Sequence, residues 1–230
     1  MTTPCLSPTP PLEEPSMLTT LRMRIADWRG RGVYEGSPNC CECIFIHIPK
    51  AAGVSVGQAL NYQSNHKPYF LFQRANPSKF KRFFKFTFVR HPHDRLLSAY
   101  SFLKKGGINH QDKAFSETHL TSIESFEQFV KEWISPQRLW SIPHLHPQHY
   151  FVADKAGRIQ VDFVGRLENI EADFHTVAQR LGIEATLAHK NRSDHAPYET
   201  AYDAEMARIA TELYAQDFAL FDYTPITGQS

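Results

Sequence analysis

Residues 44–58 decide the fold of this chain, and they read Ile44-Phe45-Ile46-His47-Ile48-Pro49-Lys50-Ala51-Ala52-Gly53-Val54-Ser55-Val56-Gly57-Gln58. The apolar start of this stretch predicts a buried strand, its small residues predict a tight loop, and Ser55 to Asn61 predicts the start of a helix. The N–H groups of such a loop and the N-terminus of the helix favour an anion. Lys50 adds a full positive charge, and Ser55 is placed to cap the helix or to contact a phosphate oxygen. We therefore predict a phosphate-type ligand at residues 49–55.

This stretch differs from the Walker A loop of nucleoside triphosphatases. That motif requires Gly-x4-Gly-Lys-Ser/Thr, in which the lysine follows the loop. Here Lys50 precedes the loop, and no Lys-Ser or Lys-Thr pair follows a glycine-rich run. The pattern argues against magnesium-dependent hydrolysis of a nucleoside triphosphate. An ordinary strand-to-helix turn with a surface lysine remains the alternative for this stretch taken alone.

The composition of the chain limits its class. The 230 residues can bury one substantial core, and the formal net charge of +1 gives no reason to expect binding to nucleic acid. No apolar run approaches the roughly 20 residues of a membrane span, and the N-terminus lacks the basic and apolar regions of a signal peptide. We therefore expect a cytoplasmic protein without a transmembrane segment. A lumenal location stays open if the chain belongs to a longer eukaryotic protein.

The four cysteines do not form a recognisable metal site. They are Cys5, Cys40, Cys41 and Cys43, and they all lie in the first fifth of the chain. Cys40 and Cys43 have Cys-x2-Cys spacing, but no second pair follows to complete a zinc site. We interpret them as small apolar residues that lead into the strand, and we predict no metal site.

Strand and helix patterns alternate along the chain, which predicts an α/β fold with a parallel sheet flanked by helices. Strands are expected at 44–48, 69–72, 83–89 and 159–164. Helices are expected at 18–28, from Ser55 onward, and at 93–105, 125–134, 171–181 and 198–218, while 108–122 is expected to be a polar loop. Ligands bind beyond the carboxyl ends of parallel strands. Lys50 and Arg90, which each follow a predicted strand, are therefore candidate ligand residues.

A second stretch carries candidate anion ligands, and it reads Phe86-Thr87-Phe88-Val89-Arg90-His91-Pro92-His93-Asp94-Arg95-Leu96-Leu97-Ser98-Ala99-Tyr100. Arg90 ends the strand, and Ser98 lies two turns into the helix that Pro92 begins. A guanidinium with a nearby hydroxyl is a good phosphate receptor, because arginine donates two parallel hydrogen bonds. For Arg95 we favour a structural ion pair with Asp94 or with a neighbouring element.

Together the two stretches resemble the PAPS-dependent sulfotransferases, and most closely the family-2 carbohydrate sulfotransferase type. Residues 46–55 are similar to the family's 5′-phosphosulfate loop, and residues 88–100 are similar to its 3′-phosphate motif. The segment His144-Leu145-His146-Pro147-Gln148 resembles the family's His-x-x-Pro-Gln segment, and Lys190-Asn191-Arg192-Ser193 resembles its C-terminal loop. The resemblance covers roughly residues 42–223. The chain departs from the pattern at Val54, where the family usually has a hydroxyl residue.

The resemblance implies a P-loop-type sulfotransferase fold and assigns roles to individual residues. The family transfers the sulfuryl group of PAPS (3′-phosphoadenosine 5′-phosphosulfate) to a hydroxyl or amine, and it implies no metal here. The 5′-phosphosulfate would be held by the loop residues Lys50, Ala51, Ala52, Gly53, Val54 and Ser55. The 3′-phosphate would be held by Arg90 and Ser98, with Arg192 and Ser193 closing over the nucleotide. Lys50 would also neutralise charge on the bridging oxygen.

A histidine is expected to take the proton of the acceptor, because its ordinary pKa of about 6.5 suits a general base. His144 is the first choice by its match to the family segment, His146 is the second and His149 the third. A packing or capping role for these histidines stays open, as does Glu168 as the base. His47 is interpreted as a strand histidine with satisfied hydrogen bonds.

The acceptor is expected to be a glycan or glycoconjugate, on the resemblance alone. The basic run at 79–85 could line a groove for an anionic glycan, although one solvated face of a strand is the preferred interpretation. We expect 1–38 to be a flexible leader with a short helix, and 39–225 to be a single sulfotransferase-like domain. Two other functions remain open, namely a catalytically inactive PAPS- or nucleotide-binding protein of the same fold and a small-molecule kinase.

Overall fold

The computed structural model describes residues 15–63, 65–187 and 197–229. Within these residues the chain forms two compact units. The sheet unit takes its described residues from Pro11–Val89 and Gln148–Asn191, and the helical unit from Arg90–Pro147 and Arg192–Ser230. The chain therefore leaves the sheet unit directly after a strand and re-enters it inside the His-x-x-Pro-Gln segment.

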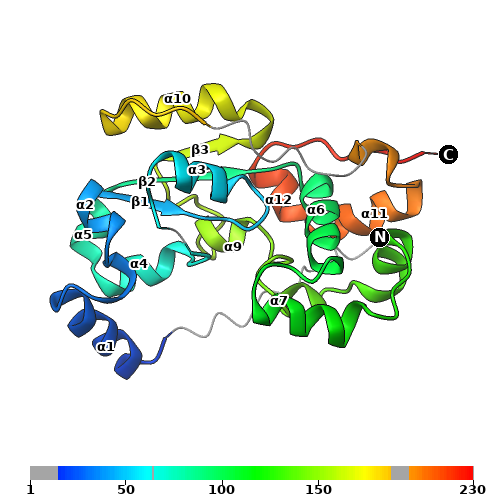
Figure 1. Cartoon of the computed structure of the whole chain (residues 1–230), viewed down its shortest axis with the longest axis horizontal. Helices are drawn as coiled ribbons and strands as arrows, with labels where there is room; N and C mark the ends of the chain where they lie inside the picture. The colour runs from blue at the N-terminus through cyan, green and yellow to red at the C-terminus, as the bar shows by residue number, and fades with distance from the viewer. Residues whose placement is uncertain (1–14, 64, 188–196, 230) are drawn as a thin grey trace. The chain divides into compact units, whose positions relative to one another are not determined.

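The sheet unit is built on three parallel strands in the order β1-β2-β3 (Figure 1). They are β1 (Cys43–Ile46), β2 (Phe84–Val89) and β3 (Phe163–Arg166). Every residue of β1 is buried, and so is every residue of β2 after its first. Such continuous burial is typical of a parallel sheet that is covered on both faces. The predicted α/β class with a parallel sheet is confirmed.

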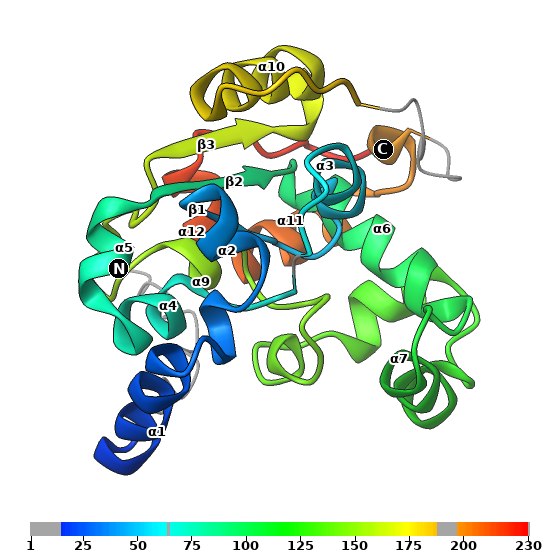
Figure 2. The ribbon, with the colours of Figure 1, turned by 60° about the vertical axis from the view of Figure 1, so that its left-hand side comes forward.

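Helices cover both faces of this sheet. One core cluster joins side chains of α3 and α10 to Phe45 of β1 and Phe86 of β2. In both views α4 and α9 lie on the opposite side of the strands from α10 (Figure 1, Figure 2), and the rings of Phe70 and Tyr150 bring α4 and α9 into contact at 5.8 Å. The helical elements of this unit are α1 (Met17–Trp28), η1 (Gly32–Tyr34), α2 (Ser37–Cys41), α3 (Gly53–Ala59), α4 (Tyr69–Ala75), α5 (Pro77–Arg82), α9 (His149–Val152), η5 (Leu167–Asn169) and α10 (Ile170–Leu181).

The helical unit has its own apolar core, in which α6 packs against α11 and against the turns that follow α7 and α8. Leu103 of α6, Phe129, Leu145 and Ala210 of α11 are fully buried in that core. The elements of this unit are α6 (Pro92–Lys104), α7 (His110–Phe115), η2 (Ser116–Leu120), α8 (Phe126–Gln128), η3 (Phe129–Trp133), η4 (Arg138–Trp140), η6 (Tyr198–Thr200), α11 (Ala204–Leu213) and α12 (Ala215–Leu220).

Several elements agree with the sequence prediction to within one or two residues. These are α1, β2, α6 with Pro92 in its first turn, and α10, which ends at Leu181 and is followed by Gly182 with a left-handed φ of 66°. The predicted helix at 125–134 is present as α8 followed by the π-helical turn η3. Residues 49–55 are called the anion loop. The helix predicted after this loop is α3, which begins at Gly53, two residues before Ser55. Local signals such as these prolines and glycines placed the element boundaries well.

The strand predicted at 69–72 is wrong, because these residues begin helix α4. Four apolar residues in a row fit a strand or a helix equally well. The buried side chains of α4 are Tyr69, Phe72 and Ala75, which recur every third residue as on one face of a helix. The basic run at 79–85 likewise lies mostly in α5, which Asn76 caps by accepting a hydrogen bond from the Lys79 N–H at 3.0 Å.

Three further predictions need correction. Residues 108–122 are largely helical and not a loop, because Asn109 caps α7 and the helix continues into η2. The single helix predicted at 198–218 is divided into η6, α11 and α12, because Asp203 caps a new helix by accepting from the Met206 N–H. The last strand occupies 163–166 and not 159–164, and Ile159 forms only an isolated bridge with Ala153.

Candidate functional site

The loop at residues 49–55 follows the carboxyl end of β1 and has an unusual backbone. Lys50 and Ala52 both have left-handed conformations, with φ of 66° and 61°. Such a conformation costs an L-residue about 1–2 kcal/mol, and strained residues of this kind cluster at ligand-binding sites. A left-handed residue next to a helical one turns successive N–H groups toward one concavity, which binds anions. Ala52 and Gly53 form such a pair.

The first turn of α3 is left without a side-chain cap. Ala52 is the N-cap residue and has no side-chain oxygen, so its side chain does not compete for the N–H groups of the first turn. The first helical hydrogen bond runs from the Val56 N–H to the Ala52 carbonyl at 3.1 Å. Ser55 is the third residue of α3, so its hydroxyl lies in the first turn as predicted, although it is not the N-cap.

Gly53 allows the loop to lie directly against a buried histidine. A Cβ at this position would come within 1.8 Å of Cδ2 of His47. The His47 ring stacks on Phe45 with centroids 5.7 Å apart, and the His66 ring meets it at 4.4 Å. Nδ1 of His66 also lies 3.2 Å from the His47 carbonyl oxygen. These contacts position the loop through His47, which agrees with the interpretation of that residue as structural.

Arg90 opens the helical unit and is held by a carboxylate one helical turn later. Its Nε and Nη2 donate to the two oxygens of Asp94 at 2.6 and 2.7 Å. Both residues are shielded from solvent, and a paired guanidinium of this kind has one fixed orientation. Ser98 is buried two turns into α6. The two residues predicted to hold the 3′-phosphate therefore lie close together in sequence within one unit. Ser98 belongs to α6, and Arg90 lies two residues before its first turn.

Arg95 is buried, and two of its hydrogen bonds go to carbonyl groups of the segment that carries His144 and His146. Asp94 pairs with Arg90, whereas Arg95 is 1% exposed and donates to the carbonyl oxygens of His144 at 3.2 Å and His146 at 2.7 Å. Its guanidinium also lies over the ring of Tyr214, 5.4 Å from the centroid. Arg95 therefore ties α6 to the segment that carries the two candidate bases.

His144 is paired with a carboxylate that the sequence analysis missed. Its Nε2 lies 3.1 Å from Oδ1 of Asp112, and both side chains are buried. Oδ2 of Asp112 accepts a hydrogen bond from the Ile108 N–H at 3.2 Å. Gly107 packs so closely that a Cβ there would lie 2.1 Å from Cβ of Asp112. The signal in the sequence was Asn109, because Asn-x-x-Asp is a helix-start pattern that places Asp112 in the first turn of α7.

The other candidate bases have different surroundings. His146 is partly buried, with Nε2 3.4 Å from the Trp140 carbonyl oxygen and its ring 5.1 Å from the Trp140 ring. His149 begins α9 in the sheet unit, and Glu168 is an exposed residue of η5. His144 is thus a candidate base whose ring nitrogen faces a buried acid. Lys190, Asn191, Arg192 and Ser193, together with residues 1–14 of the predicted leader, lie outside the described residues.

The basic run at 79–85 is engaged with acidic side chains. Lys79 Nζ lies 2.7 Å from Asp27, and Lys85 Nζ lies 2.8 Å from Asp162. Arg82 makes an exposed pair with Glu42 at 3.1 Å. The run is a helix end and a strand start held by internal ion pairs, which leaves less of its charge for an anionic glycan.

Comparison with known proteins agrees with these features. Residues 41–224 match the sequence profile of the Sulfotransferase family. Because the match covers most of the chain, this protein belongs to the sulfotransferase family. Both anion motifs and the histidine segment lie inside the matched region.

Among curated proteins the chain is similar to carbohydrate sulfotransferases of vertebrates. It is 29% identical to mouse carbohydrate sulfotransferase 11 over 170 residues, which cover 64% of this chain and 48% of the relative. It is 25% identical to carbohydrate sulfotransferase 12 of Xenopus laevis over 174 residues, which cover 63% of this chain and 41% of the relative. The chain thus spans about half the length, or less, of these relatives. No solved structure matches it.

The described residues also bear on membrane insertion and on metal binding. None of their helices combines the length and the apolar character that a membrane crossing requires. No group of three or more histidine, cysteine or acidic side chains in the described ranges is arranged to hold a metal ion. Of the three cysteines there, Cys43 is buried in β1, whereas Cys40 and Cys41 are exposed.

Proposed function

We propose that this protein is a PAPS-dependent sulfotransferase that modifies a hydroxyl or amine of a carbohydrate. The observation that carries the proposal is the 49–55 loop, in which Lys50 and Ala52 hold strained left-handed conformations at the carboxyl end of a buried strand. Family membership and the names of the two vertebrate relatives favour the same chemistry. PAPS supplies the sulfuryl group when it is bound, and adenosine 3′,5′-bisphosphate is the other product.

The loop fits the 5′ end of this donor by its chemistry. The loop forms a receptor for a doubly anionic group from three features. These are the first turn of α3, which has no side-chain cap, the left-handed and helical pair Ala52 and Gly53, and the charge of Lys50. In this proposal the N–H groups from Ala52 to Ser55 orient the phosphosulfate. The bond between sulfur and the bridging oxygen of PAPS breaks during transfer. Lys50 stabilises the negative charge that develops on this oxygen, which stays with the phosphate. Val54, which is 53% exposed, contributes its N–H but no hydroxyl.

The start of α6 supports the assignment of the 3′-phosphate to Arg90 and Ser98. Asp94 fixes the plane of the Arg90 guanidinium, and a fixed guanidinium loses little entropy when it binds an oxyanion. Asp94 also carries a negative charge beside this site. In the proposal its charge is balanced by Arg90, and Ser98 donates its hydroxyl proton to the phosphate. Arg192 and Ser193 keep their predicted role of closing over the nucleotide.

His144 is proposed to accept the proton of the attacking hydroxyl. A carboxylate only accepts hydrogen bonds, so Asp112 assigns the ring proton of neutral His144 to Nε2 and the basic lone pair to Nδ1. The oxygen–sulfur bond then forms while the proton moves to the ring. Such a base is typically worth about 10²- to 10⁴-fold in rate. His146 is the alternative base on the same segment.

Calorimetric titration with adenosine 3′,5′-bisphosphate in metal-free buffer tests the donor site. The native protein should bind it, and Lys50→Ala and Arg90→Ala should each weaken binding. Lys81→Ala is the matched control, because Lys81 is an exposed residue of α5 outside the loop. Absence of binding by folded native protein would sink the proposal. Binding that appears only with ATP and magnesium would point to the small-molecule kinase.

Turnover of PAPS separates an enzyme from an inactive binding protein of the same fold. Release of adenosine 3′,5′-bisphosphate should depend on an added glycan acceptor and fall when His144 is changed to Gln. An unchanged rate in that variant would remove His144 as the base. Donor binding without any glycan-dependent turnover would favour the inactive binding protein.

A further inference from the structure

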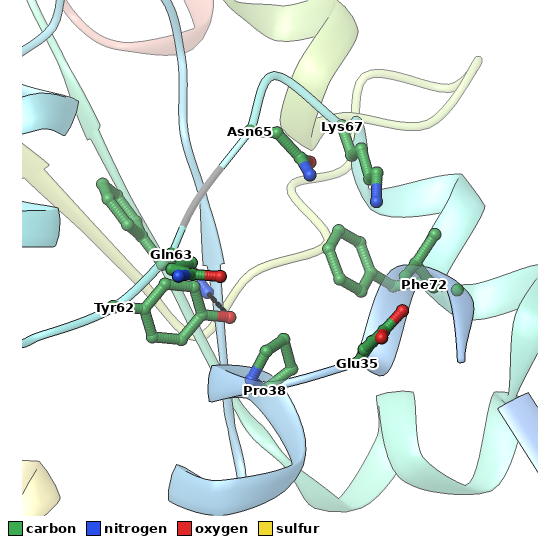
Figure 3. A pocket seen from close by; sticks show the side chains of 10 residues that line it. Glu35, Pro38, Tyr62, Gln63, Asn65, Lys67 and Phe72 are labelled. Atoms are coloured by element: carbon green, nitrogen blue, oxygen red, sulfur yellow. Dashed lines mark hydrogen bonds between the residues drawn. The ribbon is translucent and has the colours of Figure 1, made fainter. Parts of the chain in front are cut away.

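A cavity of about 350 Å³ lies in the sheet unit, apart from the 49–55 loop. Its lining comes from the segment 32–38, from Phe45 of β1, from Phe72 of α4, and from four residues after α3, namely Tyr62, Gln63, Asn65 and Lys67. Figure 3 shows Asn65 and Lys67 on one side of the cavity and Glu35 on the other. The cavity is open to solvent and lies beside β1, which is one of the two edge strands of the described sheet.

Two aromatic rings give the cavity fixed apolar walls. The Tyr62 hydroxyl donates to the Cys43 carbonyl at 3.3 Å and accepts from the Phe45 N–H at 3.2 Å, so its ring is anchored to the edge of β1. Phe72 is buried, and its carbonyl accepts from the Tyr34 hydroxyl at 3.1 Å. The walls therefore need no rearrangement before a ligand binds, as in most small-molecule sites.

Polar side chains with no internal partners surround these walls. The side chains of Glu35, Gln63, Asn65 and Lys67 make no hydrogen bond or ion pair with any other described residue. Burial lowers the pKa of Lys67, and the nearby Glu35 carboxylate only partly offsets this effect. A ligand oxygen close to Nζ would therefore stabilise the charged form of Lys67. Carboxylate, amide and ammonium groups together offer both donors and acceptors to one ligand.

We propose that this cavity is a subsite for one pyranose ring of a carbohydrate. A sugar ring has an apolar face, which suits Tyr62 and Phe72, and a rim of hydroxyls that both donate and accept. Glu35 accepts from hydroxyls, Gln63 and Asn65 do both, and Lys67 donates to a hydroxyl or to a sugar carboxylate. One positive and one negative charge in the cavity balance each other, which suits a neutral or singly acidic sugar. This inference rests on the proposed function for its choice of a glycan.

A chain of contacts connects this cavity to the anion loop within the same unit. His66 lies in the 62–67 segment, its ring meets the His47 ring at 4.4 Å, and His47 in turn lies against Gly53 of the loop. The same segment follows α3 in the chain, and the first residues of α3 belong to the anion loop. A ligand in the cavity is thus coupled by packing to the predicted donor site, which favours part of the acceptor glycan over an unrelated ligand.

Saturation-transfer NMR and calorimetry with two disaccharides test this subsite. One probe is neutral N-acetyllactosamine, and the other is a disaccharide of glucuronate and N-acetylglucosamine. The native protein should bind at least one of them, and Glu35→Gln and Lys67→Gln should each weaken binding about tenfold, as expected when a hydrogen bond to a charged group is lost. Glu184→Gln and Lys81→Gln are matched controls at exposed positions, where neither side chain makes a hydrogen bond or ion pair with another described residue.

The outcomes separate this inference from the proposed function. If the native protein binds neither probe, or if the cavity variants bind as tightly as the controls, the subsite is overturned. Titration with adenosine 3′,5′-bisphosphate is run on the same proteins. Normal bisphosphate binding without disaccharide binding would overturn the subsite alone. Disaccharide binding that needs Glu35 and Lys67, without bisphosphate binding, would support the subsite and contradict the donor site.

Discussion

Nε2 of His144 lies 3.1 Å from Oδ1 of Asp112, and both side chains are buried in the helical unit. Each partner is held independently of the other. Asp112 is fixed by the Ile108 N–H and by the close approach of Gly107, whereas the backbone of His144 is fixed by Arg95. A histidine held in this way has one ring orientation and one neutral tautomer, which are the requirements for a positioned proton acceptor.

Asp112→Asn should therefore lower turnover without unfolding the protein. The asparagine oxygen can still accept from the Ile108 N–H, but its amide would present a donor to Nε2 of His144. The ring proton would then move to Nδ1, and the basic lone pair would be lost from that atom. We expect turnover to fall by about 10²-fold or more, with unchanged affinity for adenosine 3′,5′-bisphosphate. Steady-state rates and calorimetry on the same preparation measure both quantities.

Asp222→Asn is the control for this change, because Asp222 is exposed and asparagine tolerates its left-handed φ of 52°. A structural role for the pair would lower stability and leave the pH dependence of turnover unchanged. Native turnover in the Asp112→Asn variant would show that the pair does not serve the reaction.

The helices and strands that were predicted well are marked by residues inside them or at their ends. The aromatic and branched run of β2, Pro92 in the first turn of α6 and Gly182 after α10 each mark a boundary within a few residues. The helix α4 was missed because four apolar residues do not distinguish a period of 3.6 from a period of 2. The divided final helix was missed because its break depends on Asp203 as a cap.

In the candidate site, too, some features could be predicted from the sequence and others could not. Lys50 and Arg90 were predicted because each follows a strand, and strand ends are readable. The pairing of His144 with Asp112 joins residues 32 positions apart, so only the fold reveals it. The hydrogen bonds of Arg95 to the carbonyl groups of His144 and His146 could not be predicted either, because every residue has a carbonyl group and a charge pattern does not mark it.

Gly53→Ala should damage the anion loop through His47. The new Cβ would come within 1.8 Å of Cδ2 of His47, and that ring is enclosed by Phe45 and His66. Overpacking of this kind costs about 1–3 kcal/mol. We expect a lower Tm and weaker binding of adenosine 3′,5′-bisphosphate, measured by thermal unfolding and calorimetry.

The double variant Gly53→Ala with His47→Ala distinguishes this clash from a general need for glycine. Removing the imidazole makes space for the new methyl group, so the double variant should be more stable than the sum of the two single losses predicts. Strictly additive losses would contradict the role assigned to the contact between Gly53 and His47.

Arg95→Lys should destabilise the helical unit although it conserves the charge. Arginine donates to the His144 and His146 carbonyls from two separate nitrogens, Nη1 and Nη2. Lysine has a single nitrogen, which cannot occupy both positions. A buried carbonyl left without a donor costs about 1–3 kcal/mol. Urea unfolding measures the loss, and Arg208→Lys is the control, since Arg208 makes an exposed pair with Glu212. Equal stability of the two variants would show that the Arg95 contacts are not needed.

Stability should decrease in mild acid because of His93, which is fully buried in the helical unit. Burial, aided by the nearby His91, lowers the pKa of His93 from 6.5 to about 3. Thr211 donates its hydroxyl proton to the Ala207 carbonyl, so the hydrogen bond between His93 Nε2 and the Thr211 oxygen at 3.1 Å is donated by His93. The imidazole is thus held neutral in the folded protein.

The sign of the effect follows from which state binds the proton. Below pH 6.5 the unfolded chain takes up a proton that folded His93 does not take up until about pH 3. The contribution of His93 is therefore complete above pH 6.5 and is lost as the pH falls toward 3. At about 1.4 kcal/mol for each unit, roughly 2 kcal/mol should be lost between pH 6.5 and about pH 5.

His93→Phe tests this prediction, because phenylalanine keeps the ring contacts with Tyr202 and Phe218 but does not titrate. Urea unfolding at about pH 7.5 and about pH 5 gives the loss of stability in each protein, and the other histidines cancel in the comparison. The variant should lose about 2 kcal/mol less than the native protein. His110→Gln, at an exposed position, should behave as the native protein does. An equal loss in the native protein and in His93→Phe would show that His93 takes up its proton at the same pH whether the chain is folded or unfolded.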